Sequence, residues 1–299
     1  MKKVFALMLA AVMMMAVLTS CGGDNASDTT TTGANGTEAP AGLTSDISVI
    51  AREEGSGTRG AFVELMGVVD EEENDITVAS AEITNSTSVM MSTVAGNVNA
   101  IGYISLGSLN DTVKAVKVDG VAATVEDINN GSYKVSRPFV IATKGEVSEL
   151  AQDFIDFIMS NDGQQIIEDE GYIKVEGSGE DYTASGLTGT VSLAGSTSVS
   201  PVMEKIGDAY KALNDGVTIE IQQTGSGAGI TSTIEGACDI GMSSRALKEE
   251  EIAEGLEATT IATDGIAVIV NNDNPIEDIS SESIKEIYLG NVTNWADVK

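Results

Sequence analysis

Three short segments of the chain share one pattern, in which a strand leads into a glycine-serine turn and the turn opens a helix. The first copy, residues 47–66, begins with an apolar, β-branched run, passes through Gly-Ser-Gly-Thr, and continues with apolar residues at helical spacing. The second and third copies are residues 190–213 and 218–236. Strands that alternate with helices predict an α/β fold with mainly parallel sheets, in which ligands bind beyond the carboxyl ends of the strands.

Each of these turns has the chemistry of an anion-binding site. The first turn of a helix carries unpaired N–H groups and the positive end of the helix dipole. Glycine lets the backbone approach a ligand, the Ser and Thr hydroxyl groups donate hydrogen bonds, and Arg52 beside the first turn adds a charged donor. One such turn is usually no more than a capped helix, but three in one chain favour an anion site.

Composition excludes several classes of function. With 16 basic and 46 acidic residues the chain has a net charge of −30, which argues against nucleic acid as a partner and against long-range attraction of anions. The sequence contains no histidine, so His-dependent catalytic triads and His-ligated metals are excluded. Neither a Gly-x-Ser-x-Gly nor a Gly-x4-Gly-Lys-Ser/Thr motif occurs. An enzyme that processes phosphate compounds is therefore the weaker alternative to a binding protein without metal or cofactor.

The amino-terminal region predicts export and anchoring. Residues 1–20 combine two lysines with an apolar run, as in a secretory signal peptide, and are too short for an ordinary membrane-spanning helix. The run ends in Leu18-Thr19-Ser20-Cys21, which resembles the bacterial lipobox. That resemblance implies lipid attachment at Cys21 and a position on the outer face of the bacterial cell membrane. Residues 21–45 are polar and are predicted to form a disordered tether before the fold begins at Asp46.

Hydrophobic periodicity indicates further elements. Residues 148–159 carry apolar side chains at helical spacing, and residues 161–163 are expected to cap the next helix. The continuous apolar run of residues 265–270 is typical of a central parallel strand. Residues 176–189 are polar and rich in glycine, and we expect them to form a joint between two parts of the fold.

Several motifs together closely resemble the PstS group, the phosphate-binding proteins of bacterial ABC importers. The motifs are REEGSGTRGAF, NAIGYISLGSL, AGSTSVSPVMEKI, TGSGAGI and DIGMSSRAL. The resemblance implies a two-lobed, type II periplasmic-binding-protein fold that closes on one inorganic phosphate and docks on the permease subunits of an importer. A receptor or sensor for another oxyanion, such as sulfate or a phosphorylated metabolite, without a transporter of its own is the alternative within this fold.

The resemblance also implies which residues contact the ligand. Its phosphate contacts fall on Arg52, Ser56, Gly57, Thr58, Thr197, Ser198 and Ser226. Many members of the family have an aspartate that accepts the proton of phosphate within the segment matching GMSSRAL, where this chain has Ser244. The hydroxyl of Ser244 accepts that proton but does not repel a fully deprotonated anion. Ser244 therefore does not explain a preference for phosphate over sulfate. Asp264 or a nearby acid is a candidate substitute for the missing aspartate.

The order of the motifs differs from that of the family. Residues 46–175 match the second half of the family's sequence, and residues 189–299 match its first half. This order predicts a circular permutation in which residues 176–189 join the old ends, because the termini of such folds lie at the surface, often close together. A truncated tandem array or a mispredicted gene is the rival explanation.

The permutation has a consequence for the two lobes. Residues 46–111 and 271–299 are expected to form one lobe, lobe B, and residues 112–270 the other, lobe A. We expect a monomer whose folded part begins and ends side by side in lobe B.

Overall fold

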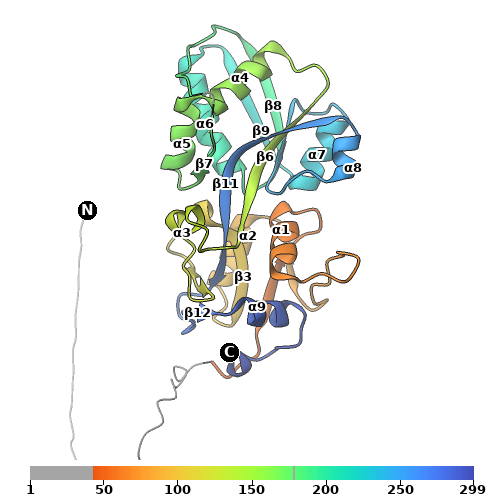
Figure 1. Cartoon of the computed structure of the whole chain (residues 1–299), viewed down its shortest axis with the longest axis vertical. Coiled ribbons are helices and arrows are strands. Elements are labelled where there is room, and N and C mark those ends of the chain that lie inside the picture. The colour runs from red at the N-terminus through yellow and green to blue at the C-terminus, as the bar shows by residue number, and fades with distance from the viewer. Residues whose placement is uncertain (1–42, 178) are drawn as a thin grey trace, which may run out of the picture. The chain divides into compact units, whose positions relative to one another are not determined.

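The computed structural model describes residues 43–177 and 179–299 (Figure 1). The predicted signal peptide, Cys21 and most of the predicted tether lie outside the described residues. Among the described residues, no helix has the length and apolar character needed to cross a membrane.

The strands are β1 (Ser48–Arg52), β2 (Glu82–Thr84), β3 (Ala100–Ser105), β4 (Lys114–Ala115), β5 (Lys117–Val118), β6 (Ser136–Lys144), β7 (Ile173–Lys174), β8 (Gly189–Gly195), β9 (Val217–Gln223), β10 (Ile240–Ser243), β11 (Leu256–Val270) and β12 (Asp278–Ile279). The helices are α1 (Gly57–Met66), α2 (Thr87–Ala95), α3 (Val125–Asn129), α4 (Glu149–Met159), α5 (Asn161–Asp169), α6 (Ser200–Leu213), α7 (Ser226–Ile234), α8 (Glu249–Ala253) and α9 (Ser281–Tyr288), with short 3-10 helices η1 (Leu106–Ser108) and η2 (Trp295–Asp297).

The strands form two parallel groups that are joined by antiparallel strands. The order across the main sheet is β2-β1-β3-β11-β6-β10-β8-β9. Strand β1 is parallel to β2 and β3, and β8 is parallel to β9 and β10. Helices flank both groups, α1, α2 and α9 near the first and α4 to α8 near the second (Figure 1). The predicted α/β class, with parallel strands flanked by helices, is confirmed.

Strand β11 connects the two groups and, with 15 residues, is the longest strand of the described residues. Its residues 256–265 pair with β6 and its residues 266–270 pair with β3, in both cases antiparallel. The prediction of a central parallel strand at residues 265–270 is therefore wrong in direction and in extent. A strand that is buried on both faces is apolar whichever way its neighbours run, so the apolar run does not reveal the direction.

Two hydrophobic cores define two lobes. Phe139, Phe154 and Ile206 belong to the main core of lobe A, whereas Phe62 and Tyr288 belong to that of lobe B. The chain crosses between the lobes along β6 and β11 (Figure 1). Because these crossing strands are hydrogen-bonded to each other, the lobes share one continuous sheet at the crossing.

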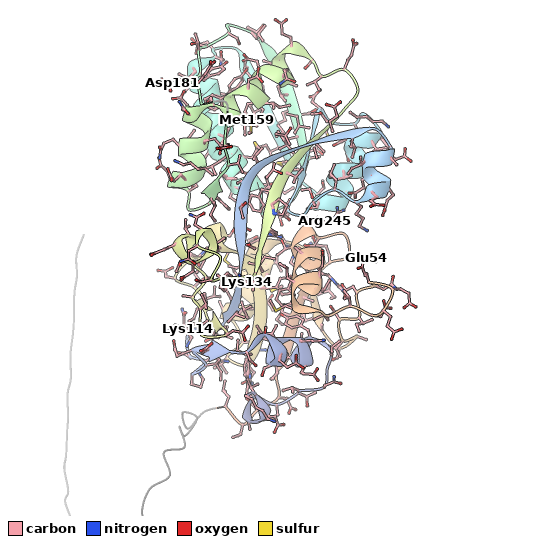
Figure 2. All side chains as sticks on the ribbon, in the orientation of Figure 1. Glu54, Lys114, Lys134, Met159, Asp181 and Arg245 are labelled. Carbon is pink, nitrogen blue, oxygen red and sulfur yellow. The ribbon has the colours of Figure 1, made fainter. Side chains whose placement is uncertain are left out.

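The division between the lobes falls later in the chain than expected. The sequence predicts residues 112–135 in lobe A, but Val113 and Tyr133 are buried in the cores of lobe B. This segment is held there by long-range pairings, β4 with β11 and β5 with β12, which local sequence patterns do not reveal. Figure 2 likewise shows Lys134 in lobe B and Asp181 in lobe A.

The crossing points follow from the pairing of β6 with β11. Ser136 and Gly265 are register partners, and they mark the level at which β11 leaves β6 and joins β3. By this packing lobe B comprises residues 43–135 and 266–299, and lobe A comprises residues 136–265. Lobe A is therefore one continuous segment inserted into lobe B.

The first and last parts of the folded chain lie side by side in lobe B, as expected. Asp46 and Asn294 form an antiparallel bridge, and the Ile47 N–H donates to the Thr293 carbonyl at 2.8 Å. Leu43 also packs against the core of lobe B, so the fold begins slightly before Asp46. Lobe B is thus closed by contacts between segments far apart in the sequence.

The predicted joint packs against lobe A over its described residues. The ring of Tyr182 meets the ring of Phe157 edge to face, with centroids 5.0 Å apart, and its hydroxyl donates to Asp153 Oδ2 at 2.6 Å. Helix α5 begins close by, and its cap is Ser160, whose hydroxyl accepts from the Gly163 N–H at 3.2 Å. The prediction that residues 161–163 provide the cap is wrong because Ser160 has the extended backbone and the side-chain oxygen that an N-cap requires.

Candidate anion-binding site

The three predicted turns meet where the two lobes face each other. The Gly227 N–H donates to the Gly55 carbonyl at 2.9 Å, which joins the third turn to the first. The Thr58 and Ser198 hydroxyl oxygens are 2.9 Å apart, which joins the first turn to the second. Residues from both sequence blocks are therefore needed to build one site.

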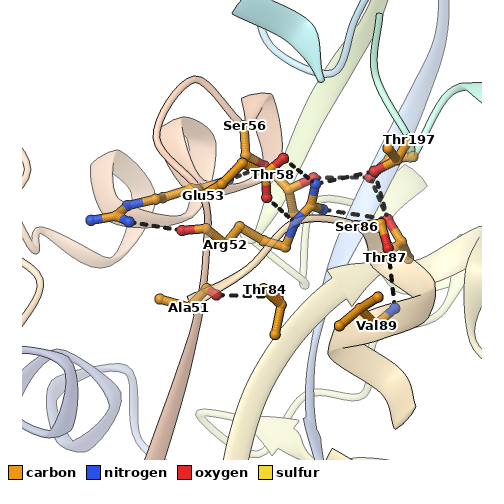
Figure 3. A network of polar contacts seen from close by, with 12 residues as sticks. Ala51, Arg52, Glu53, Ser56, Thr58, Thr84, Ser86, Thr87, Val89 and Thr197 are labelled. Atoms are coloured by element: carbon orange, nitrogen blue, oxygen red, sulfur yellow. Dashed lines mark hydrogen bonds and ion pairs between the residues drawn. The ribbon is translucent and has the colours of Figure 1, made fainter. Parts of the chain in front are cut away.

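Arg52 is the charged group of this site. It ends β1, is only 2% exposed, and its backbone N–H donates to the Tyr103 hydroxyl at 3.1 Å. Its Nη2 donates to Thr197 Oγ1 at 3.1 Å, and its Nη1 lies 3.4 Å from Thr87 Oγ1 (Figure 3). Its Nε and Nη2 each donate to one carboxylate oxygen of Glu53 at 2.8 Å. The guanidinium is thus fixed between a carboxylate of lobe B and a hydroxyl of lobe A.

Four buried hydroxyl groups gather beside Arg52. Thr87 Oγ1 lies 3.4 Å from Thr197 Oγ1 and 3.3 Å from Ser198 Oγ, and Ser198 in turn contacts Thr58. All four side chains are buried. A hydroxyl group can turn its proton toward a ligand, so this cluster offers rotatable donors on both sides of the lobe boundary.

Ser226 and Ser244 form a second pair of hydroxyl groups, next to Gly57 of the first turn. Their hydroxyl oxygens are 3.3 Å apart, and the Ser244 N–H donates to Ser226 Oγ at 3.2 Å. A Cβ on Gly57 would lie 2.4 Å from Ser226 Oγ and 2.7 Å from Ser244 Oγ. Only glycine at position 57 therefore allows the lobes to approach this closely.

Ser56 lies at the site but its oxygen serves the backbone. It is the N-cap of α1, and its hydroxyl accepts from the Arg59 N–H at 3.3 Å. By contrast, no side chain of the described residues caps α6 or α7. Part of their first turns is engaged by backbone carbonyls instead, since the Ser200 N–H donates to the Ser196 carbonyl at 3.0 Å and the Gly227 N–H to the Gly55 carbonyl at 2.9 Å.

Thr87 is a site residue that the sequence reasoning missed. It is the first residue of α2, directly after the N-cap Ser86, whose hydroxyl accepts from the Val89 N–H at 3.2 Å (Figure 3). The signal was present, because β2, a Ser/Thr turn and α2 repeat the pattern of the three turns without a glycine. This fourth unit differs from the other three in that its turn has no glycine.

A cavity of about 360 Å³ opens beside the buried hydroxyl groups. Thr87 of lobe B and Thr197 of lobe A both line it, so these two side chains lie between the cavity and Arg52. The complete lining is Ser86, Thr87, Ser88, Met91, Ser108, Thr197, Pro201 and Gln223. The site is therefore reached from a space that both lobes border.

Asp264 is already bound within the crossing strands. It is 1% exposed, its Oδ2 accepts from Arg137 Nη2 at 3.0 Å, and its Oδ1 accepts from the Ser105 hydroxyl at 2.9 Å. Burial raises the pKa of the Asp264 carboxyl to about 6, against the opposing effects of Arg137 and Ser105, and burial also lowers the pKa of Arg137. Both carboxylate oxygens of Asp264 already accept hydrogen bonds from Arg137 and Ser105. Asp264 is therefore a poor candidate for the proton acceptor that is missing at Ser244.

Comparison with known proteins identifies the class and then the family. A family model described as a PBP superfamily domain matches residues 26–162 and 181–299. The chain is 52% identical over 257 residues to phosphate-binding protein PstS 2 of Streptococcus agalactiae, covering 84% of this chain and 87% of that protein. It therefore belongs to the PstS-type phosphate-binding proteins of the PBP superfamily.

Two further comparisons define the extent of the likeness. The crystal structure of a phosphate-binding protein of a phosphate ABC transporter from Streptococcus pneumoniae TIGR4 matches with a TM-score of 0.68 and 46% identity, covering 85% of this chain and all of that one. Phosphate-binding protein PstS of Staphylococcus saprophyticus is 34% identical over only 117 residues, which is 37% of either chain. The two-lobed fold is therefore shared with a solved phosphate-binding protein over its full length.

Proposed function

We propose that the protein captures inorganic phosphate outside the cell and delivers it to an ABC importer. The observation that carries this proposal is the convergence of buried Arg52 with the hydroxyl groups of Thr58, Thr197 and Ser198 from both lobes. Phosphate presents acceptor oxygens in several directions, and donors from two lobes surround it better than donors from one face. The names of the streptococcal relatives support the same ligand and the same transport role.

Binding without catalysis is the role that this chemistry supports. Apart from the Glu53 carboxylate, which is paired with Arg52, the candidate site brings together hydroxyl groups and one guanidinium, groups that stabilise an anion in place. Hydrolysis of a phosphate ester needs an activated nucleophile or a bound metal ion, and the sequence contains no histidine to act as a base. The function proposed is therefore that of a receptor that closes on its ligand and releases it unchanged.

The direct test is calorimetric titration of the purified, ligand-free protein with inorganic phosphate. We expect one phosphate per chain with at least micromolar affinity, which corresponds to about −8 kcal/mol. A parallel titration with sulfate distinguishes a phosphate receptor from a receptor for another oxyanion. The absence of both heat and thermal stabilisation in millimolar phosphate would contradict the proposal.

We also infer that the protein is anchored by lipid at Cys21 and that it docks on membrane permease subunits. The lipobox-like sequence Leu18–Cys21 supports the anchor. A protein held by one lipid-modified residue is tethered without a spanning helix. The substitution Cys21→Ala is expected to move the protein from the membrane fraction to the soluble fraction of fractionated cells, and unchanged retention would point to a different anchor.

The permuted order of the two sequence blocks remains part of the proposal. The 257-residue alignment with the Streptococcus agalactiae relative is too long to lie within one block, whereas the Staphylococcus saprophyticus relative aligns over only 117 residues, about the length of one block. This contrast, and the bridge between Asp46 and Asn294, support a permuted order shared with the first relative over a broken gene. Size-exclusion chromatography with light scattering provides the test. A monomer that binds one phosphate is expected, and binding only by a dimer would exclude a complete site within one chain.

A further inference from the structure

Glu53 places a carboxylate at the boundary of the anion-binding site. It follows Arg52 directly, and its side chain is 25% exposed. One nitrogen, Arg52 Nη2, donates both to Glu53 Oε1 at 2.8 Å and to Thr197 Oγ1 at 3.1 Å (Figure 3). Arg52 Nη2 therefore holds both the carboxylate of Glu53 and the hydroxyl group of Thr197, which is one of the predicted phosphate contacts.

The same carboxylate also reaches the third turn, on lobe A. Glu53 Oε1 lies 3.5 Å from the position that a Cβ on Gly225 would take. Gly225 is the N-cap of α7 and adopts φ of 89°, a conformation that favours glycine. Glu53 thus extends from lobe B to the turn that carries Ser226, one of the predicted phosphate contacts.

The other carboxylates around these turns are engaged elsewhere or face solvent. Asp264 is bound by Arg137 and Ser105, Asp75 accepts from Arg59 Nε at 2.5 Å, and Glu251 accepts from both terminal nitrogens of Arg245 at 2.7 and 2.8 Å. Glu54 is exposed and lies at the edge of the molecule (Figure 2). Of these groups Glu53 alone is both close to the site and oriented by its charged residue.

We propose that Glu53 is the residue by which the site distinguishes a protonated oxyanion, phosphate, from a fully deprotonated one, sulfate. The proposal rests on the function proposed above. In it, the carboxylate of Glu53 takes the place of the one that is missing at Ser244. An ionised carboxylate only accepts hydrogen bonds, so it forms a charge-assisted bond with the O–H of phosphate. With sulfate, which has no proton, two negatively charged oxygens face each other instead.

The pairing with Arg52 leaves Glu53 able to act in this way. A carboxylate has about four lone-pair positions, and Arg52 occupies one on each oxygen. Ser244 cannot supply the same discrimination, because a neutral hydroxyl group can donate to sulfate as well as accept from phosphate. Glu53 therefore adds the repulsive element that selectivity between two anions of similar shape requires.

The test compares Glu53→Gln with Glu54→Gln and with the unmodified protein, each titrated with inorganic phosphate and with sulfate at one ionic strength. Glutamine keeps the size of Glu53 and one acceptor oxygen for Arg52, but it removes the charge and can donate to sulfate. We expect the ratio of the sulfate Kd to the phosphate Kd to fall about tenfold or more in Glu53→Gln, the range of one charge-assisted hydrogen bond. Glu54→Gln is expected to keep the ratio of the unmodified protein.

Two outcomes overturn the role of Glu53. The first is an unmodified protein that binds sulfate as tightly as phosphate, and the second is a Glu53→Gln protein with an unchanged ratio. An unchanged ratio with both ligands weakened equally would mean that Glu53 only orients Arg52. An unmodified protein that does not bind phosphate contradicts the proposed function itself, whereas phosphate binding with an unchanged ratio in the variant contradicts only the role of Glu53.

Discussion

The hydroxyl oxygens of Thr58 and Ser198 lie 2.9 Å apart, although the two residues are 140 positions apart in the chain. Thr58 is in the first turn of α1 in lobe B, and Ser198 is in the turn that precedes α6 in lobe A. So short a contact requires the lobes to be closed on each other at this point. An anion that accepts hydrogen bonds from both hydroxyl groups would contact both lobes at once.

Arg52→Ala is expected to weaken phosphate binding more than Ser198→Ala. Removal of a charged donor loses charge-assisted hydrogen bonds worth about 1.5–3 kcal/mol, whereas a neutral hydroxyl contributes about 0.5–1.5 kcal/mol. Calorimetric titration of the two variants with phosphate measures the difference. Equal losses in the two variants would count against Arg52 as the anchor of the anion.

Gly57→Ala is expected to weaken phosphate binding about tenfold or more while leaving the protein folded. The added methyl group would meet Ser226 Oγ at 2.4 Å and Ser244 Oγ at 2.7 Å, so the lobes cannot close fully. Gly60→Ala, in the same helix, is the matched control, because its nearest neighbour, Arg245 Cδ, would be 3.6 Å away. Titration with phosphate and thermal unfolding are measured for both variants, and similar affinities in the two would show that closure at Gly57 is not required.

Arg137→Met is expected to destabilise the fold by about 3–5 kcal/mol, because it leaves the buried Asp264 carboxylate without its partner. The double variant Arg137→Met with Asp264→Leu is expected to recover most of that loss, since apolar residues of similar volume replace a buried pair at little cost. Urea unfolding provides the free energies. A double variant as unstable as the single one would show that the pair contributes more than mutual neutralisation.

The stability of the protein is expected to depend on pH through Asp264. Burial raises its pKa to about 6 in the folded state, against about 3.9 in an unfolded chain, so the folded chain binds more protons at this group between these values. The contribution of Asp264 to the free energy of unfolding is therefore largest below about pH 4 and declines as the pH rises through about 6. Urea unfolding of the unmodified protein and of Asp264→Asn between pH 4 and pH 7 isolates this group. We expect the unmodified protein to lose stability relative to the variant as the pH rises, and a constant difference would contradict the assignment.

Local features of the site could be predicted from the sequence. Gly57, Thr197 and Ser226 stand in turns whose residue types, order and following helices are legible within a few positions of each. Thr87 contacts Thr197 and Ser198 from a turn without glycine, and Glu53 is indistinguishable in the sequence from the exposed Glu54 beside it. Their importance depends on contacts with the other lobe, which no local pattern contains.

The boundaries of the lobes could not be predicted for a related reason. Val113 and Tyr133 belong to lobe B because β4 and β5 pair with strands more than 150 positions away, such as Ala115 with Ile269. The antiparallel direction of β11 was likewise hidden, because burial on both faces gives the same apolar run in either direction. Sequence patterns identify elements, whereas these facts concern which elements become neighbours.

The nesting of lobe A within lobe B bears on the order in which the protein takes shape during synthesis. Residues 136–265 emerge from the ribosome as one uninterrupted stretch that contains every strand and helix of lobe A. Lobe B is incomplete until the end of β11 and α9 have been synthesised, because Ile284 and Ile287 of α9 belong to its core. Because domains form as units as they emerge, lobe A can be complete while the earlier-made half of lobe B still exposes its apolar face. Arg52 and Thr58 are translated long before Thr197, but the core of the lobe that carries them is complete only once α9 has been made.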